Sequence, residues 1–201
     1  MNIDRPEKNV IEKLQIEEQL DLFEKMPYLQ LLDLVDEPNG SICKKLYFDH
    51  QGMMNKAWGS SSKHQAWEGG YVDHLEECMN IGVVLYDETN SLRKLPFSKS
   101  SLLLVLDLHD LEKAWKYGGG IREKEELSNY ANYQDFIAAK IDQYGFILSE
   151  EERNGLKYVH GEGTDYHPGR RVQSPLAAFV HICDVFSARI WFDYPKKVGK
   201  Y

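Results

Sequence analysis

The sequence lacks any long apolar run and any excess of positive charge. No uninterrupted apolar stretch among its 201 residues approaches the roughly 18 residues that a membrane-spanning helix needs, so we expect no membrane partner. The first residues also lack the basic and then apolar pattern of a secretion signal, and we therefore expect a cytoplasmic protein. A formal charge of -8 would repel the phosphates of a long nucleic acid, whereas a small anion needs only a local cationic site.

Cysteine is scarce, and its three occurrences are far apart in the chain. An odd number of cysteines without a Cys-x-x-Cys pair argues against both a disulfide framework and a thiolate zinc site. We expect Cys43, Cys78 and Cys183 to be buried free thiols. The composition, 42% apolar and 28% charged, is that of an ordinary globular protein, and the length fits one domain.

The sequence does contain apolar residues spaced three or four positions apart, and this spacing predicts an all-α fold. Glycine and proline interrupt this spacing between residues 27 and 62. We expect residues 1–62 to form an N-terminal helical arm packed on a core of residues 63–201, together one folding unit. The predicted helices span residues 10–26, 71–86, 98 or 100 to about 118, 123–144, 149–160 and 174–194.

The dipeptide His109-Asp110 ends an apolar run at residues 102–108, where a buried helix would ordinarily carry only core residues. Imidazole and carboxylate groups are metal ligands. Such a pair alone is also typical of a helix end that is satisfied by hydrogen bonds. His74 and Asp184 each lie in an apolar helical pattern of their own and are further candidate ligands.

In chain order, His74, His109-Asp110 and Asp184 resemble the ligands of the HD-domain metal-dependent phosphohydrolase superfamily. Residues 63–74 look like its first block, in which a His and a Gly-Gly pair precede the first ligand, and residues 109–113 are similar to its His-Asp-x-x-Lys block. Residues 158–161 and 181–184 match more loosely. The resemblance covers about residues 63–189 and implies an HD-domain-like helical bundle that holds a metal through His74, His109, Asp110 and Asp184.

The resemblance also implies roles for residues around these ligands. Asp110 would orient the attacking water as well as bind metal, and Lys113, one helical turn after His109, would meet phosphate oxygens. His64 would supply a positive donor or act as general acid, although a surface or supporting role fits the sequence equally well. The remaining candidates for substrate binding are His160, His181, Arg170 and Arg171.

A mixed set of imidazole and carboxylate ligands suits Mn, Fe, Co, Ni or Zn better than Mg, which prefers oxygen alone. Members of the superfamily that hold two metals place an additional His between the His-Asp pair and the position resembling His160. No His lies between Asp110 and His160 in this chain. The sequence therefore favours one divalent transition metal over two.

The reaction that the resemblance implies is hydrolysis of a phosphomonoester or phosphoanhydride of a small nucleotide by a metal-activated water. Cleavage of a cyclic or dinucleotide phosphodiester is an alternative within the enzyme class. A metal-containing module that binds a nucleotide or regulates a partner without catalysis is an alternative outside it. The acidic helical surface is compatible with a monomer or a homodimer.

Overall fold

Helix α5, Lys99–Leu108, lies at the centre of the fold, and its sequence explains why. The computed structural model describes residues 25–192, and the predicted helix at residues 10–26 falls almost entirely outside this range. Ser98 caps α5 by accepting a hydrogen bond from the Ser101 amide, as predicted, and every residue from 102 to 108 is buried. A helix that is apolar on all sides must be surrounded by other helices. Accordingly, α5 packs against α2, α3, α4, α8 and α9.

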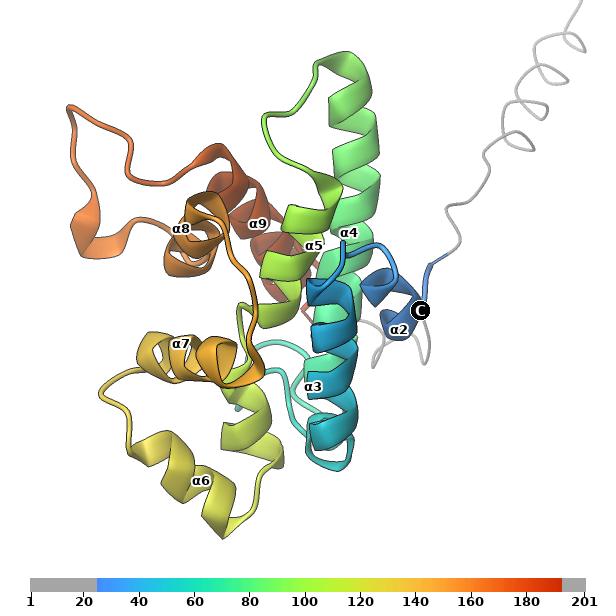
Figure 1. Cartoon of the computed structure of the whole chain (residues 1–201), viewed down its shortest axis with the longest axis vertical. Coiled ribbons are helices and arrows are strands. Elements are labelled where there is room, and N and C mark those ends of the chain that lie inside the picture. The colour runs from blue at the N-terminus through green and yellow to red at the C-terminus, as the bar shows by residue number, and fades with distance from the viewer. Residues whose placement is uncertain (1–24, 193–201) are drawn as a thin grey trace, which may run out of the picture.

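The elements around α5 come from both ends of the described range. Helices α2, Tyr28–Leu32, and α3, Asn39–Met54, cover one side, while α4, Gly70–Leu92, runs alongside (Figure 1). Helices α8, Glu150–Tyr158, and α9, Pro175–Val185, pack on another side and against each other. The remaining elements are α6, Ile121–Ser128, α7, Tyr133–Tyr144, the 3-10 turn η2, Gly163–Asp165, and two π-helical turns, η1, Ala114–Gly118, and η3, Phe186–Ile190.

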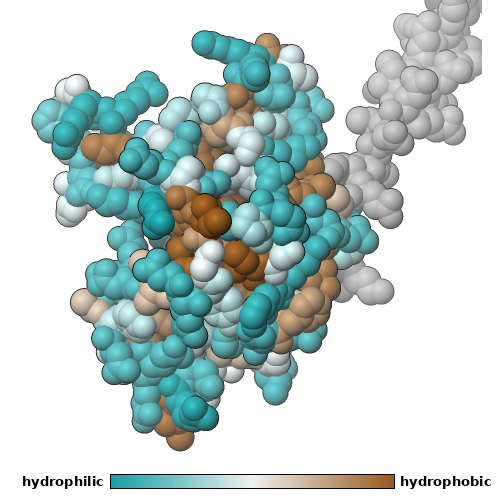
Figure 2. Space-filling view, viewed as in Figure 1, coloured by the Kyte–Doolittle hydropathy of each residue, from teal (hydrophilic) through white to brown (hydrophobic). Residues whose placement is uncertain are grey.

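The all-α prediction is confirmed, since residues 25–192 contain helices and no strand. Within the same residues, no helix is long and apolar enough to cross a membrane. The three cysteines are buried and free, as predicted. Figure 2 shows hydrophilic side chains around the margins of one face of the molecule and apolar side chains gathered near its centre.

Several predicted helix starts and stops are confirmed. Ser149 and Glu152 form the expected capping box at the start of α8, and Ser174 caps α9 with Pro175 in the first helical position. Gly145 ends α7 in the left-handed conformation, with φ 76°.

Several helix boundaries differ from the prediction, and α4 continues to Leu92 instead of ending at residue 86. The predicted helix at 123–144 is broken into α6 and α7, because the Asn132 side chain caps a new helix by accepting from the Asp135 amide. Helix α3 continues through Gly52, whose helix penalty of about 1 kcal/mol is outweighed by burial of the face that contains Cys43, Leu46 and Tyr47.

Two further differences lie beside the candidate ligands. Helix α5 ends one residue before His109, whose ring Nδ1 donates to the Leu106 carbonyl oxygen over 2.7 Å, and tighter turns follow. The last helix changes at Phe186 from α-helix to the wider π-helical turn η3, and the chain leaves the helix at Trp191.

Candidate metal centre

Four buried side chains from three parts of the chain meet beside the C-terminal end of α5. His74 comes from α4, His109 and Asp110 follow α5, and Asp184 comes from α9. One potential ligand atom from each residue lies within 4.8 Å of the others. The four residues named as ligands by the sequence resemblance are therefore the residues that the fold brings together.

The distances inside this cluster are those of groups aimed at a common point. Nε2 of His74 lies 3.3 Å from Oδ2 of Asp110 and 3.4 Å from Oδ1 of Asp184. Nε2 of His109 lies 3.1 Å from the same Asp110 oxygen and 3.8 Å from the same Asp184 oxygen. Both imidazoles thus present Nε2, and both carboxylates present one oxygen, to the same small volume.

Hydrogen bonds on the far side of each ring fix which nitrogen faces the centre. The Ser187 hydroxyl donates to Glu77 Oε2 over 2.5 Å, so it can only accept from His74 Nδ1, 3.0 Å away. His109 Nδ1 donates to the Leu106 carbonyl oxygen. In a neutral imidazole with the hydrogen on Nδ1, Nε2 carries the lone pair that a metal needs.

The turn before α4 positions His74 by close packing of backbone. Gly69 has φ 83°, a left-handed conformation that side chains disfavour. A Cβ on Gly70 would lie 1.9 Å from the Gln65 carbonyl oxygen. The Gln65 side chain then donates to both Glu77 and Ser187. The Gly-Gly pair of the sequence motif therefore allows the loop to reach the groups that orient His74.

Two buried polar atoms of the cluster show that the residues fit a metal. Nε2 of His109 and Oδ2 of Asp110 are buried without a hydrogen bond of ordinary geometry to the described residues, and their close neighbours are each other and, for Oδ2, the Lys113 ammonium group. Burying polar atoms without well-formed hydrogen bonds is costly, and a metal ion would satisfy both atoms. Two imidazole nitrogens and two carboxylate oxygens form a donor set suited to Mn, Fe, Co, Ni or Zn.

The same proximity shifts the pKa values of the cluster. Burial alone would lower the pKa of His109, but the Asp110 and Asp184 carboxylates outweigh it and raise this pKa to about 10. Burial alone would raise the pKa of Asp184, yet hydrogen bonds from His109, His160 and His74 hold it well below its usual range. Without a metal, protonated imidazoles therefore balance the two carboxylates.

A cavity of about 550 Å³ adjoins the cluster and reaches Asp184. Lys63, Lys113 and Arg189 bring three permanent cations to its wall, and Asp184 is the single carboxylate among its described lining residues. Within residues 25–192, neither Lys63 nor Arg189 forms an ion pair with a carboxylate. Such a cavity attracts anions.

Lys113 and His64 lie together on the wall of this cavity. Lys113 forms an ion pair with Asp110, and its Nζ lies 3.5 Å from Nε2 of His64. Burial lowers the pKa of His64 to about 4, and the Lys113 ammonium group adds to this effect. His64 is therefore neutral at pH 7 and acts as a proton acceptor unless a bound anion raises its pKa.

The remaining predicted substrate residues fall into two groups. His160 and His181 line the cavity, and hydrogen bonds to Asp110 and then Asp184 raise the pKa of His160 to about 9. Arg170 and Arg171 line a different hollow, along the segment between α8 and α9. Whether any of these side chains binds substrate stays a prediction.

Sequence reasoning missed several residues that the fold places at the site. Glu77 follows His74 by three positions, and Ser187 follows Asp184 by three, so the i, i+3 spacing places each near the candidate ligand that precedes it. No comparable signal singles out the others, which the chain brings in from loops or from the end of η3. These are Gln65, Lys63 and Arg189.

Comparison with protein-family models, with curated protein sequences and with solved structures finds no match for this chain. The structure accordingly defines a class by its site: an all-helical protein with a buried cluster of two histidines and two aspartates that could hold a metal ion.

Proposed function

We propose that this protein is a metal-dependent phosphohydrolase of the HD-domain type that acts on a small phosphorylated metabolite, in particular a phosphomonoester or phosphoanhydride of a nucleotide. The proposal rests on one observation, which is that the candidate metal cluster lies next to a cationic cavity. The buried cluster of His74, His109, Asp110 and Asp184 borders a cavity whose wall carries cations from three separate segments. A metal centre beside an anion-attracting cavity suits phosphoryl chemistry.

His74, His109, Asp110 and Asp184 would hold one divalent transition metal. When bound, such an ion supplies Lewis-acid polarisation of a phosphoryl oxygen and acidifies a water molecule. The protein's own groups supply the rest. Lys113 forms an ion pair with Asp110 and lines the cavity, and it would bind phosphate oxygens at the edge of the cluster.

Two histidines at the cavity differ in charge and so suit different proton transfers. His64 is neutral at pH 7 and accepts a hydrogen bond at Nε2 from Lys113. His160 is protonated below about pH 9, lies on the rim with 60% of its side chain exposed, and can donate a proton to a leaving oxygen. We assign His160 as the stronger candidate for the general acid and His64 as a residue that orients Lys113.

Turnover tests the proposal. The protein would be loaded with Mn, Co, Ni, Fe or Zn and incubated with nucleoside mono-, di- and triphosphates and with cyclic and dinucleotide diesters. We expect inorganic phosphate or polyphosphate in molar excess over protein, and loss of this release in Asp110→Ala. A nucleoside monophosphate formed from a diester would indicate the phosphodiesterase alternative. Stoichiometric binding without turnover in the metal-loaded protein would overturn the proposal in favour of a binding module.

A further inference from the structure

The cavity beside the metal cluster has an apolar side as well as a cationic one. The apolar members of its described lining are Val185, Ala188 and Phe192. They lie three and four positions apart, a spacing that places side chains on one face of a helix. This face begins directly after the candidate ligand Asp184. Phosphoryl chemistry at the cluster needs no apolar surface, so this face suits another part of the ligand.

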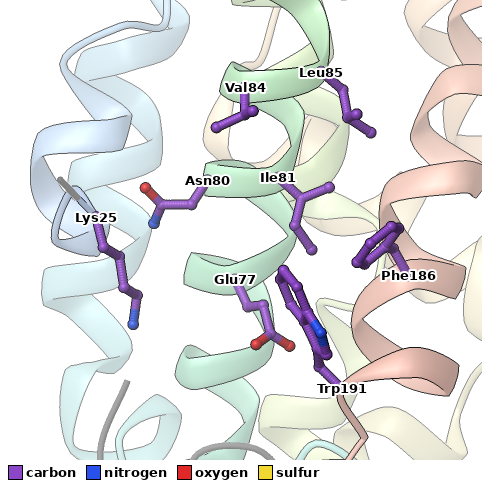
Figure 3. Close-up of a pocket in the computed structure, with 8 residues that line it drawn as sticks. All are labelled: Lys25, Glu77, Asn80, Ile81, Val84, Leu85, Phe186 and Trp191. Atoms are coloured by element: carbon purple, nitrogen blue, oxygen red, sulfur yellow. The ribbon is translucent and has the colours of Figure 1, made fainter. Parts of the chain in front are cut away.

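The last residue of this face, Phe192, is 45% exposed. Its neighbour Trp191 turns to the other side of the chain and lines a separate groove of about 270 Å³ along α4. Figure 3 shows the Trp191 ring beside Phe186 in that groove, and the two ring centroids are 4.8 Å apart. Among residues 25–192, no aromatic ring stacks on Phe192. Phe192 thus offers an uncovered aromatic ring to the cavity.

A hydrogen bond holds the backbone of Phe192 at the cavity wall. The Gln65 amide donates to the Phe192 carbonyl oxygen over 2.9 Å. Gln65 is buried, and the loop that contains it also carries Lys63 and His64 on the cavity wall. The Ser60 hydroxyl steadies this loop by accepting from the amides of both residues. An aromatic side chain whose backbone is fixed in advance binds a ligand with less loss of conformational freedom.

Groups of different chemistry follow one another along this wall. Asp184 belongs to the metal cluster, Ala188 is a small side chain four positions later, and Phe192 follows after four more. Eight positions of helical rise correspond to roughly 12 Å. Two cations accompany the wall, since Lys113 lies at the cluster and Arg189 follows Ala188 directly. The order from the cluster outward is a site for a phosphoryl group, space for a compact unit, and a flat apolar surface.

We propose that Phe192 is the platform on which the base of a nucleotide substrate stacks, while the phosphoryl group lies at the metal cluster and the sugar lies against Ala188. This inference rests on the proposed function for the position of the phosphoryl group. It narrows the substrate from any small phosphate ester to one that carries a planar aromatic ring. Stacking on an aromatic side chain tolerates every base, so Phe192 would select nucleotides as a class.

Equilibrium binding separates this inference from the hydrolase proposal. The metal-loaded protein would be titrated with ribose 5-phosphate and with the 5′-monophosphates of adenosine, guanosine, cytidine and uridine, and kcat/KM replaces Kd for any ligand that is hydrolysed. We expect at least one nucleotide to be favoured about tenfold over ribose 5-phosphate, a gain typical of stacking one base. Such a preference without turnover would contradict the hydrolase and support the platform. Turnover without any preference for nucleotides would overturn the platform alone.

Substitutions at Phe192 identify the source of the preference. Phe192→Ala should lower the nucleotide affinity to about that of ribose 5-phosphate, and Phe192→Leu should lose most of the preference because it has no flat face. Phe192→Trp should retain it. All three keep the backbone carbonyl that accepts from Gln65. The matched control is Phe48→Ala, at a phenylalanine that is 58% exposed on α3 and outside the cavity lining. An unchanged preference in Phe192→Ala, or an equal loss in Phe48→Ala, would overturn the proposal.

Ala188→Leu tests the position of the sugar. A larger side chain there fills space between the cluster and Phe192, so ribose 5-phosphate and the nucleotides should lose affinity by similar factors. A loss confined to the nucleotides would place the base at residue 188 and overturn the assignment of Phe192.

Discussion

Nε2 of His74 lies 3.3 Å from Oδ2 of Asp110 in a region where both side chains are almost completely buried. Two neutral imidazoles and two carboxylates carry a charge of -2, which a divalent ion would neutralise. Without that ion, protons on His109 and His160 offset this charge, and the Lys113 ammonium group lies beside Asp110. The cluster is therefore a site at which protons and a metal compete for the same groups.

This competition predicts that metal affinity rises with pH. The pKa of His109 is raised to about 10, so at pH 7 the ring is protonated, and a metal must displace that proton to bind Nε2. Each pH unit between 6 and 9 should strengthen binding by about tenfold per displaced proton. Competition titrations with Zn or Co at several pH values measure this slope, and a pH-independent affinity would contradict it.

Removing one carboxylate should remove the metal. Asp184→Asn keeps the size of the side chain but halves the negative charge offered by the cluster, and we expect the metal affinity to fall by more than about 100-fold. Asp142→Asn is the matched control, because Asp142 is exposed on α7. Elemental analysis after purification without chelator gives the metal content of each variant. Equal content in both would exclude Asp184 as a ligand.

The Ser187 hydroxyl should influence metal binding without touching the metal. In Ser187→Ala, His74 Nδ1 loses its hydrogen-bond acceptor and the ring loses its fixed orientation. We expect a 10- to 100-fold loss of metal affinity, the range typical of such supporting groups. Ser128→Ala, at an exposed hydroxyl that donates to the Glu125 carbonyl oxygen, should leave the affinity unchanged. A purely structural role would lower thermal stability alone.

The unpaired cations of the cavity should set the affinity for an anionic substrate. Lys63→Gln and Arg189→Gln each remove a cation from its wall. We expect KM to rise by about tenfold in each, with little change in kcat, since the cations bind the ground state and the transition state alike. Arg122→Gln, on α6 and outside the cavity lining, is the control. A fall in kcat at constant KM would instead assign these side chains to the chemical step.

The meeting of the four candidate ligands was predictable because they stand next to strong local signals. His109-Asp110 ends a run of residues that can only be a core helix, and Ser174-Pro175 marks the start of the helix that carries Asp184. The cavity wall was less predictable. Arg189 reaches it because the chain widens into the π-helical turn η3, whereas Arg170 and Arg171 line another hollow despite a composition suited to phosphate. Local sequence does not specify where such a loop packs.

The glycine pair before His74 can be tested by adding a single methyl group at Gly70. A Cβ at Gly70 would meet the Gln65 carbonyl oxygen at 1.9 Å, and that oxygen is backbone that already accepts from the amides of Gly59 and Trp67. We expect Gly70→Ala to lower the free energy of unfolding by about 2–3 kcal/mol and to weaken metal binding, since Gln65 supports Ser187.

Gly52→Ala is the matched control, because a Cβ there meets nothing within 4 Å and the residue lies inside α3. That change should raise the free energy of unfolding by about 0.5–1 kcal/mol and leave metal affinity unaltered. Denaturant unfolding and metal titration of both variants provide the comparison. If Gly70→Ala bound metal as well as Gly52→Ala does, the Gly-Gly pair would be dispensable for the centre, and the contacts from Gln65 through Ser187 to His74 would not hold the ring in place.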